Sequence, residues 1–135
     1  MAYPITDIPV IGPDSADILK KDGIRTTVAL LLKAGTPKQR LRLAEKLNTE
    51  ERRVLDWVTA ADRMRVKGVG WEYAELLRAV GVKTVAELKY RNPAKLVEAM
   101  GEANKKRKLV RLLPSERTVA RWIESAKTLP TVVRY

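Results

Sequence analysis

The stretch Lys67-Gly68-Val69-Gly70-Trp71-Glu72-Tyr73-Ala74-Glu75-Leu76-Leu77, followed by Gly81-Val82-Lys83-Thr84, decides the fold. Ala74, Leu77 and Val80 recur at a spacing of three, which predicts one face of a short helix. Gly81 follows at the place where helices commonly end in a left-handed residue. Thr84, with Glu87 three residues later, predicts a capping box at the start of the next helix. The stretch therefore predicts a glycine turn at 67–70, a short helix, a bend at Gly81 and another helix.

The same pattern occurs 58 residues earlier in the chain. The identical pairs are Gly12/Gly70, Ala16/Ala74, Leu19/Leu77, Gly23/Gly81, Thr26/Thr84 and Leu30/Leu88. Further along, an offset of 65 residues aligns 54–58 with 119–123 and pairs Trp57 with Trp122. The larger offset places about seven extra residues in the second copy, within a basic insertion at 102–111. We therefore expect a tandem duplication of residues 1–64 and 65–135.

Three further helices are expected, each from a start signal followed by an apolar face. The first begins at Thr36-Pro37 and buries Leu41, Ala44 and Leu47. The second begins at Thr49 and buries Val54, Trp57, Val58, Ala61 and Met64. The third begins at Pro114-Ser115 and buries Val119, Trp122, Ile123 and Ala126. No segment alternates as a half-buried strand would. The sequence predicts an all-α protein that packs as one compact pseudo-symmetric domain, with an extended tail over 129–135.

The composition excludes several functional classes. The 135 residues hold 27 Lys and Arg against 16 Asp and Glu, a formal net charge of +11, and neither Cys nor His. No disulfide, thiolate zinc site or cysteine nucleophile is possible, and the commonest metal ligand and general base are missing. We expect no cofactor, no metal and no enzymatic activity. The charge favours a polyanionic partner, above all nucleic acid.

Membrane insertion and secretion are not expected. The longest apolar run, 28–32, is far too short to cross a bilayer. The start, Met1-Ala2-Tyr3-Pro4, has neither a basic nor an apolar leader region. We expect a cytoplasmic, nucleoid-associated monomer.

The segment Lys67-Gly68-Val69-Gly70, with Ala74, Leu77, Gly81 and Thr84 behind it, resembles the helix-hairpin-helix motif of proteins that bind DNA without sequence specificity. The resemblance covers both copies, roughly Pro9 to Leu30 and Lys67 to Leu88. The whole layout is similar to small proteins with duplicated helix-hairpin-helix domains. It implies a SAM/helix-hairpin-helix-like fold that binds double-stranded DNA, in repair, replication, recombination or nucleoid organisation. It also implies phosphate contacts by the backbone around Gly68, Gly70 and Glu72, with charge from Lys67.

The physical reason is that a glycine turn lets the backbone approach a phosphate closely. It also leads into a helix N-terminus, where unpaired N–H groups favour an anion. The two copies are not equivalent, since residues 1–64 carry a net charge of +2 (11 basic, 9 acidic) and residues 65–135 one of +9 (16 basic, 7 acidic). Pro9 and Val10 replace Lys67 and Gly68 in the first copy. This predicts that the glycine turn of the second copy, residues 67–70, is the stronger phosphate site.

The predicted DNA-binding residues lie in three places. In the second copy they are Lys67, Gly68, Val69, Gly70, Trp71, Glu72, Lys83 and Thr84, and in its basic insertion Lys105, Lys106, Arg107, Lys108 and Arg111; in the first copy they are Gly12, Pro13, Arg25 and Thr26. The insertion is expected to be a flexible basic loop that either tracks phosphates or is simply solvated. Trp71 has two interpretations, stacking on a base or covering the underside of the turn.

Two other functions compete with DNA binding. The first is an adaptor that docks on a DNA-processing protein, with the weaker first repeat as the contact surface. The second is a DNA glycosylase or abasic-site lyase with Lys95 or Lys106 as the reactive amine. The chain looks too small to build a pocket for a base, which makes the enzyme the least favoured of the three.

Overall fold

The computed structural model describes residues 2–135, and the described chain is all helical. In chain order the elements are the 3-10 helices η1 (Ile5–Asp7) and η2 (Pro9–Ile11) and the α-helices α1 (Pro13–Lys21), α2 (Thr27–Ala34), α3 (Pro37–Leu47), α4 (Glu51–Arg63), α5 (Trp71–Ala79), α6 (Val85–Leu88), α7 (Pro93–Arg107) and α8 (Glu116–Thr128). The described residues form no β-strand, only one isolated bridge between Pro4 and Thr26. The predicted fold class, all-α, is confirmed.

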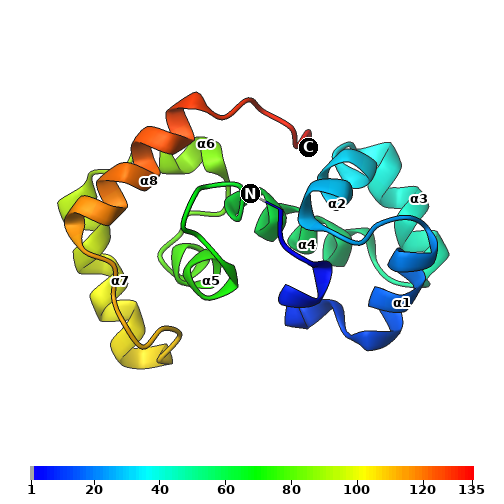
Figure 1. The fold of residues 1–135 in the computed structure, drawn as a ribbon, viewed down its shortest axis with the longest axis horizontal. Helices are drawn as coiled ribbons and strands as arrows, with labels where there is room; N and C mark the ends of the chain where they lie inside the picture. The colour runs from blue at the N-terminus through cyan, green and yellow to red at the C-terminus, as the bar shows by residue number, and fades with distance from the viewer. Residues whose placement is uncertain (1) are drawn as a thin grey trace.

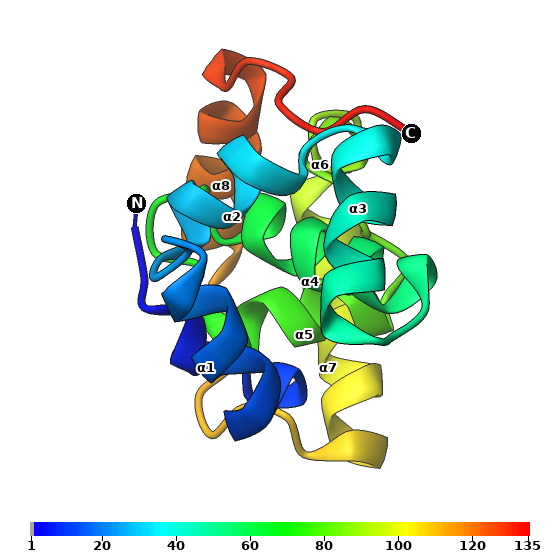
Figure 2. The ribbon, with the colours of Figure 1, turned by 90° about the vertical axis from the view of Figure 1, so that its right-hand side faces the viewer.

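Helix α4 joins two groups of helices (Figure 1). It packs against α2 and α3 of the first half and against α5 of the second. Figure 2 shows α2 and α3 in front of α4 when the molecule is seen from the side of the first half. The contacts of α2 and α3 with α4 correspond to those of α6 and α7 with α8. Each half is therefore arranged around its own tryptophan-bearing helix.

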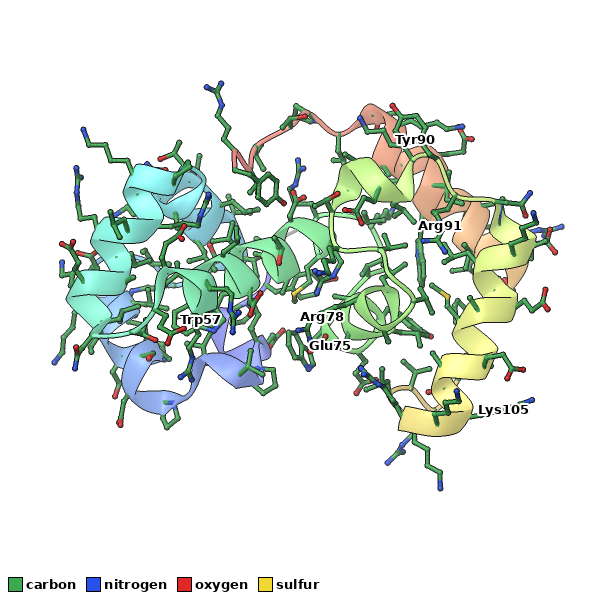
Figure 3. All side chains as sticks on the ribbon, turned by 180° about the vertical axis from the view of Figure 1, so that it is seen from behind. Trp57, Glu75, Arg78, Tyr90, Arg91 and Lys105 are labelled. Atoms are coloured by element: carbon green, nitrogen blue, oxygen red, sulfur yellow. The ribbon has the colours of Figure 1, made fainter. Side chains whose placement is uncertain are left out.

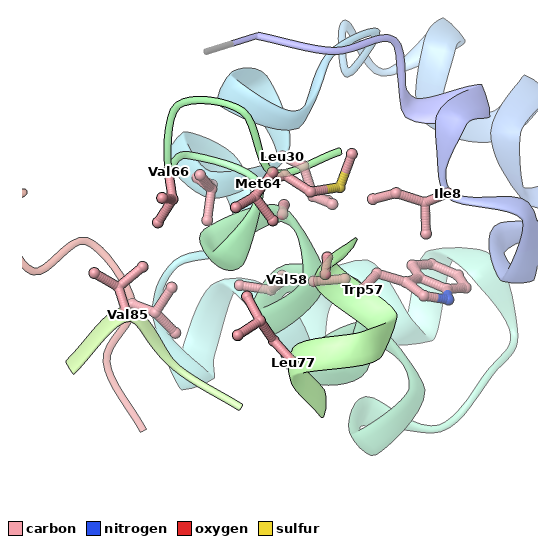
Figure 4. Close-up of a cluster of buried hydrophobic side chains, with 14 of the residues drawn as sticks. Ile8, Leu30, Trp57, Val58, Met64, Val66, Leu77 and Val85 are labelled. Carbon is pink, nitrogen blue, oxygen red and sulfur yellow. The ribbon is translucent and has the colours of Figure 1, made fainter. Parts of the chain in front are cut away.

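The two halves share one hydrophobic core, which Figure 4 shows around Ile8, Trp57, Met64 and Leu77. Trp57 and Trp122 are both buried, as predicted from their apolar helix faces. Met64 and Val66 are also fully buried, so the boundary between the two copies lies inside the core rather than in a linker. Removing either half would expose this apolar surface to water.

The turns that flank α1 and α5 follow the sequence signals closely. Gly23 and Gly81 have φ angles of +82° and +90°, the left-handed values expected after each helix. The hydroxyls of Thr26 and Thr84 accept hydrogen bonds from the N–H groups of Ala29 and Glu87, so both threonines cap the next helix. The predicted capping box at Thr84 is wrong in one respect. The Glu87 carboxylate accepts from the N–H of Lys83 instead of that of Thr84.

Two other expectations are wrong, and one helix was not expected. Leu41 does not point inward but is 54% exposed, and Arg40 occupies the buried face of α3 in its place. Thr49 does not cap α4, whose N-cap is Glu50. Helix α7 was not predicted at all, although Asn92 caps it and Pro93 opens it in the manner of Thr36-Pro37 at α3.

The C-terminal tail, 129–135, contains no helix, as predicted, and it returns from α8 to the first half (Figure 1). The N–H of Arg134 donates to the carbonyl of Gly35 at 2.7 Å, and Val133 is buried. Arg40 Nη2 donates to the carbonyl of Arg134 at 2.6 Å. The tail therefore ties the end of the second half to α2 and α3.

Candidate nucleic-acid interface

The second glycine turn, residues 67–70, lies at the surface with one anchor in the core. Val69 is fully buried and its N–H donates to the carbonyl of Val66, whereas Lys67 and Gly68 are exposed. Gly68 has a φ of +89°, which side chains rarely adopt. The turn is thus held from below by one residue and presents its backbone outward.

This turn leaves several backbone donors free. Within the described chain, no hydrogen bond uses the N–H groups of Gly68, Gly70, Trp71 or Glu72; the helix ladder begins with Ala74, which donates to Gly70. Unpaired N–H groups at the start of a helix carry partial positive charge and are suited to an anion. The second turn therefore has the donors that phosphate binding needs.

The first glycine turn, residues 9–12, with the start of α1 behind it, has lost two of the four corresponding donors. The N–H of Gly12 already donates to the carbonyl of Pro9 at 3.2 Å, and Pro13 has no N–H. At the position of Gly68 stands Val10, which lies in η2 and whose carbonyl accepts from Arg53 at 3.3 Å. Asp14, in the first turn of α1, adds an exposed negative charge. The first turn thus has fewer amides to offer a phosphate.

Gly12 and Gly70 are aligned in sequence but differ in backbone conformation. Gly12 has a φ of +81°, so a side chain there would be strained. Gly70 has a φ of −88°, and a Cβ at this position would meet no atom of the chain within 4 Å. Nothing in the described structure requires residue 70 to lack a side chain.

The basic insertion is not the flexible loop that was expected. Lys105, Lys106 and Arg107 form the last turn of α7, and Lys108 is its left-handed C-cap. Cations at a helix C-terminus are stabilised by the helix dipole. The Asn104 side chain then closes the following bend with two hydrogen bonds of 3.0 Å to Val110. Figure 3 shows Lys105 near the C-terminal end of α7.

The end of α7 and the second turn are connected through Tyr73 and Trp122. The Tyr73 hydroxyl donates to the carbonyl of Leu112 at 2.9 Å, and its ring lies 5.2 Å from that of Trp122. A Cβ on Gly68 would lie 3.4 Å from Trp122 Nε1. Lys67, next to Gly68, and Arg111, next to Leu112, therefore lie at the two ends of one chain of contacts.

Four predicted residues lie farther from the turns. Lys83 and Thr84 follow α5, at the end opposite its glycine turn, and Arg25 and Thr26 follow α1 in the same way. The threonine hydroxyls are used as helix caps, and the Lys83 N–H is bonded to Glu87. Nothing in the described contacts joins these four residues to a glycine turn.

Trp71 packs mainly against the chain itself. Its side chain is half-buried against the core and lines a groove between the two halves, together with Val10 and Trp57. Arg53, Arg78 and Glu75 also line this groove, and the last two form an ion pair at 3.7 Å (Figure 3). This position favours the second interpretation of Trp71, a cover for the underside of the turn.

Arg63 was not recognised from the sequence, yet it holds the helix that follows the turn. Its buried guanidinium donates to the carbonyls of Ala74, in the first turn of α5, and of Lys83, just before α6, both at 2.9 Å, and so ties both segments to α4. Burial lowers the pKa of Arg63 to about 10. The only sequence signal was a charged residue on the apolar face of a helix that also carries Val54 and Trp57.

Comparison with known proteins places the chain in a family. The family model described as a domain of unknown function, DUF4332, matches residues 9–129. The chain belongs to this family. No curated protein and no solved structure matches it. The DUF4332 match includes both glycine turns and every predicted DNA-binding residue.

Two further findings concern the DUF4332 chain as described. Among residues 2–135, no helix is both long enough and apolar enough to span a bilayer. The same residues contain no group of three acidic side chains placed to hold a metal ion.

Proposed function

We propose that this protein is a tandem helix-hairpin-helix module that binds the phosphate backbone of double-stranded DNA without sequence specificity. The second turn is the principal contact and the basic end of α7 a second one. The observation that carries the proposal is the group of free N–H donors at Gly68, Gly70, Trp71 and Glu72.

Three features support it. The donors lie at the start of a nine-residue helix, and Lys67 is exposed beside them. The half that holds them has a net charge of +9. The backbone hydrogen bonds around the two turns recur at equivalent positions, such as Ile24 to Leu19 and Val82 to Leu77, which supports a duplicated hairpin unit.

Binding of a fluorescent duplex at several salt concentrations tests the proposal. Contact with about four to seven phosphates releases counterions, so the logarithm of affinity falls against that of salt with a slope of roughly −4 to −6. Two duplexes of unrelated sequence bind equally well, because phosphate contacts carry no base information. A flat salt dependence contradicts the mechanism.

The variant Gly70→Ala separates binding from folding. The new methyl group meets no atom of the free protein, and on the proposed function it crowds a phosphate bound at the neighbouring amides. We expect the affinity to fall about tenfold with no loss in Tm, since hydrogen bonds to charged groups are lost. Gly101→Ala in α7 is the control, because a Cβ there meets only Leu113, at 4.0 Å. An unchanged affinity of Gly70→Ala for DNA contradicts the assignment of the turn.

An adaptor role through the first half is the second candidate. It is favoured by Val28 and Leu32, exposed apolar residues one turn apart on α2. If the wild-type protein binds no nucleic acid at low salt, this candidate replaces the first.

A further inference from the structure

The indole of Trp122 points at the second turn from inside the core. The residue lies in α8 and is only 2% exposed. Among the described residues beyond the chain neighbours of Gly68, its Nε1 is the one atom within 4 Å of the place where a Cβ on Gly68 would lie, at 3.4 Å. The tilted ring of Tyr73, 5.2 Å away, packs against it. A deeply buried side chain thus brings its one polar atom to the exposed glycine.

This N–H has no partner within the described chain. None of the hydrogen bonds of residues 2–135 uses Trp122 Nε1, although the indole N–H is a donor that usually finds an acceptor when buried. In the described chain, every side-chain nitrogen that is sealed from solvent has a hydrogen-bond partner. Because the indole nitrogen of Trp122 has no partner, it is still open to solvent. The missing side chain of Gly68 provides that opening.

The first half differs at the matching place. Trp57 aligns with Trp122, but the residue that aligns with Gly68 is Val10, which has a side chain. The guanidinium of Arg53 lies 5.8 Å from the Trp57 ring centroid and donates to the Val10 carbonyl. Trp57 Nε1 also has no partner within the described chain and so reaches solvent, but the groove beside Trp57 is lined by Val10 and Arg53. Only in the second half does the tryptophan nitrogen lie beside a glycine turn with free amides.

We propose that the Trp122 indole N–H is a further phosphate ligand, which donates to the same phosphodiester oxygens as the amides of the second turn. The inference rests on the proposed function and adds a side-chain donor to it. An indole can only donate, so its partner has to be an acceptor. The neighbouring free donors and Lys67 favour an acceptor that is negatively charged.

The variant Trp122→Phe tests this assignment, because it keeps an aromatic ring and removes the N–H. We expect a loss of about tenfold in affinity for duplex DNA, typical of one hydrogen bond to a charged group. Trp57→Phe, the matching change in the first half, keeps wild-type affinity. The thermal stability of both variants is measured to compare their folding.

A measurement on the wild-type protein does not depend on any variant. The chain has three tryptophans, so its ¹H–¹⁵N spectrum contains three indole signals, which single Trp→Phe variants assign. On titration with duplex DNA, the Trp122 indole proton shifts downfield and that of Trp57 does not. Inorganic phosphate as the probe gives a smaller shift in the same direction.

The outcomes separate the two proposals. If the duplex binds but the Trp122 signal moves no more than that of Trp57, the indole is not a ligand and the proposed function stands. If Trp122→Phe binds as tightly as wild type, the same conclusion follows. If the wild-type protein binds no duplex at all, the proposed function fails and this inference fails with it.

Discussion

Glu72 places an acidic side chain beside the free amides of the second turn. It is exposed in the first turn of α5, where a negative charge stabilises the helix through its dipole. The same charge repels a phosphate that approaches the turn. Glu72 therefore stabilises the helix but repels the proposed phosphate ligand. Removing its charge is expected to raise the affinity for DNA, whereas the changes proposed above lower it.

Glu72→Gln is expected to raise the affinity for duplex DNA about threefold at low salt, with the gain fading as salt screens the charge. Fluorescence anisotropy at two salt concentrations measures it. Asp14→Asn, the corresponding change in the first turn of α1, leaves the affinity unchanged if the first turn does not bind phosphate. A larger gain from Asp14→Asn than from Glu72→Gln would reverse the ranking of the two copies.

At the scale of elements, α7 places four consecutive cations at its C-terminal end. Lys105 forms an ion pair with Glu102 at 3.5 Å, whereas Lys106 and Lys108 are exposed and take part in no ion pair of the described chain. The helix and the Asn104 bend fix the backbone that carries these cations, so little backbone entropy is lost when they meet a phosphate. A folded helix end thus replaces the expected flexible loop.

The double change Lys106→Gln and Lys108→Gln should weaken duplex binding and reduce the salt slope by about 1 to 2, since each phosphate contact contributes roughly 0.9. The control changes Lys38 and Arg42 to Gln in α3, which removes the same charge from the exposed surface of the first half. Binding isotherms at several salt concentrations compare the two. Equal slopes for both double variants would show that only net charge matters.

At the scale of the whole molecule, the tail and the shared core keep the two halves together. The tail bonds to Gly35 through Arg134 and receives bonds from Arg40 and, at Pro130, from Arg65. It thereby sets the position of the first half relative to the second. Such a fixed arrangement would preorganise the two proposed contacts with duplex DNA.

Val133→Ala is expected to lower the free energy of unfolding by about 1.5 kcal/mol, the value of two buried methyl groups. Urea denaturation followed by circular dichroism measures the change. The neighbouring Val132→Ala is the control, because Val132 is partly exposed and should lose far less. Similar losses for both variants would mean that the tail does not dock through Val133.

The sequence by itself determined the helical class, most helix starts and the apolar faces, because these depend on residues close together along the chain. Thr26, Thr84 and Ser115 cap their helices as predicted, and Trp57 and Trp122 lie in the core. The glycine spacing also located the second turn. Helix α7 also has a local start signal, the cap Asn92 followed by Pro93.

Only the tertiary structure decided which donors of the turns are free, how Arg63 is buried, and where the tail docks. Each depends on contacts between residues far apart in the sequence, such as Arg40 with Arg134 or Gly68 with Trp122. A local pattern specifies a backbone conformation, but it does not specify which buried atom packs behind it. The direction of the Trp122 N–H therefore follows from how α8 packs against the turn.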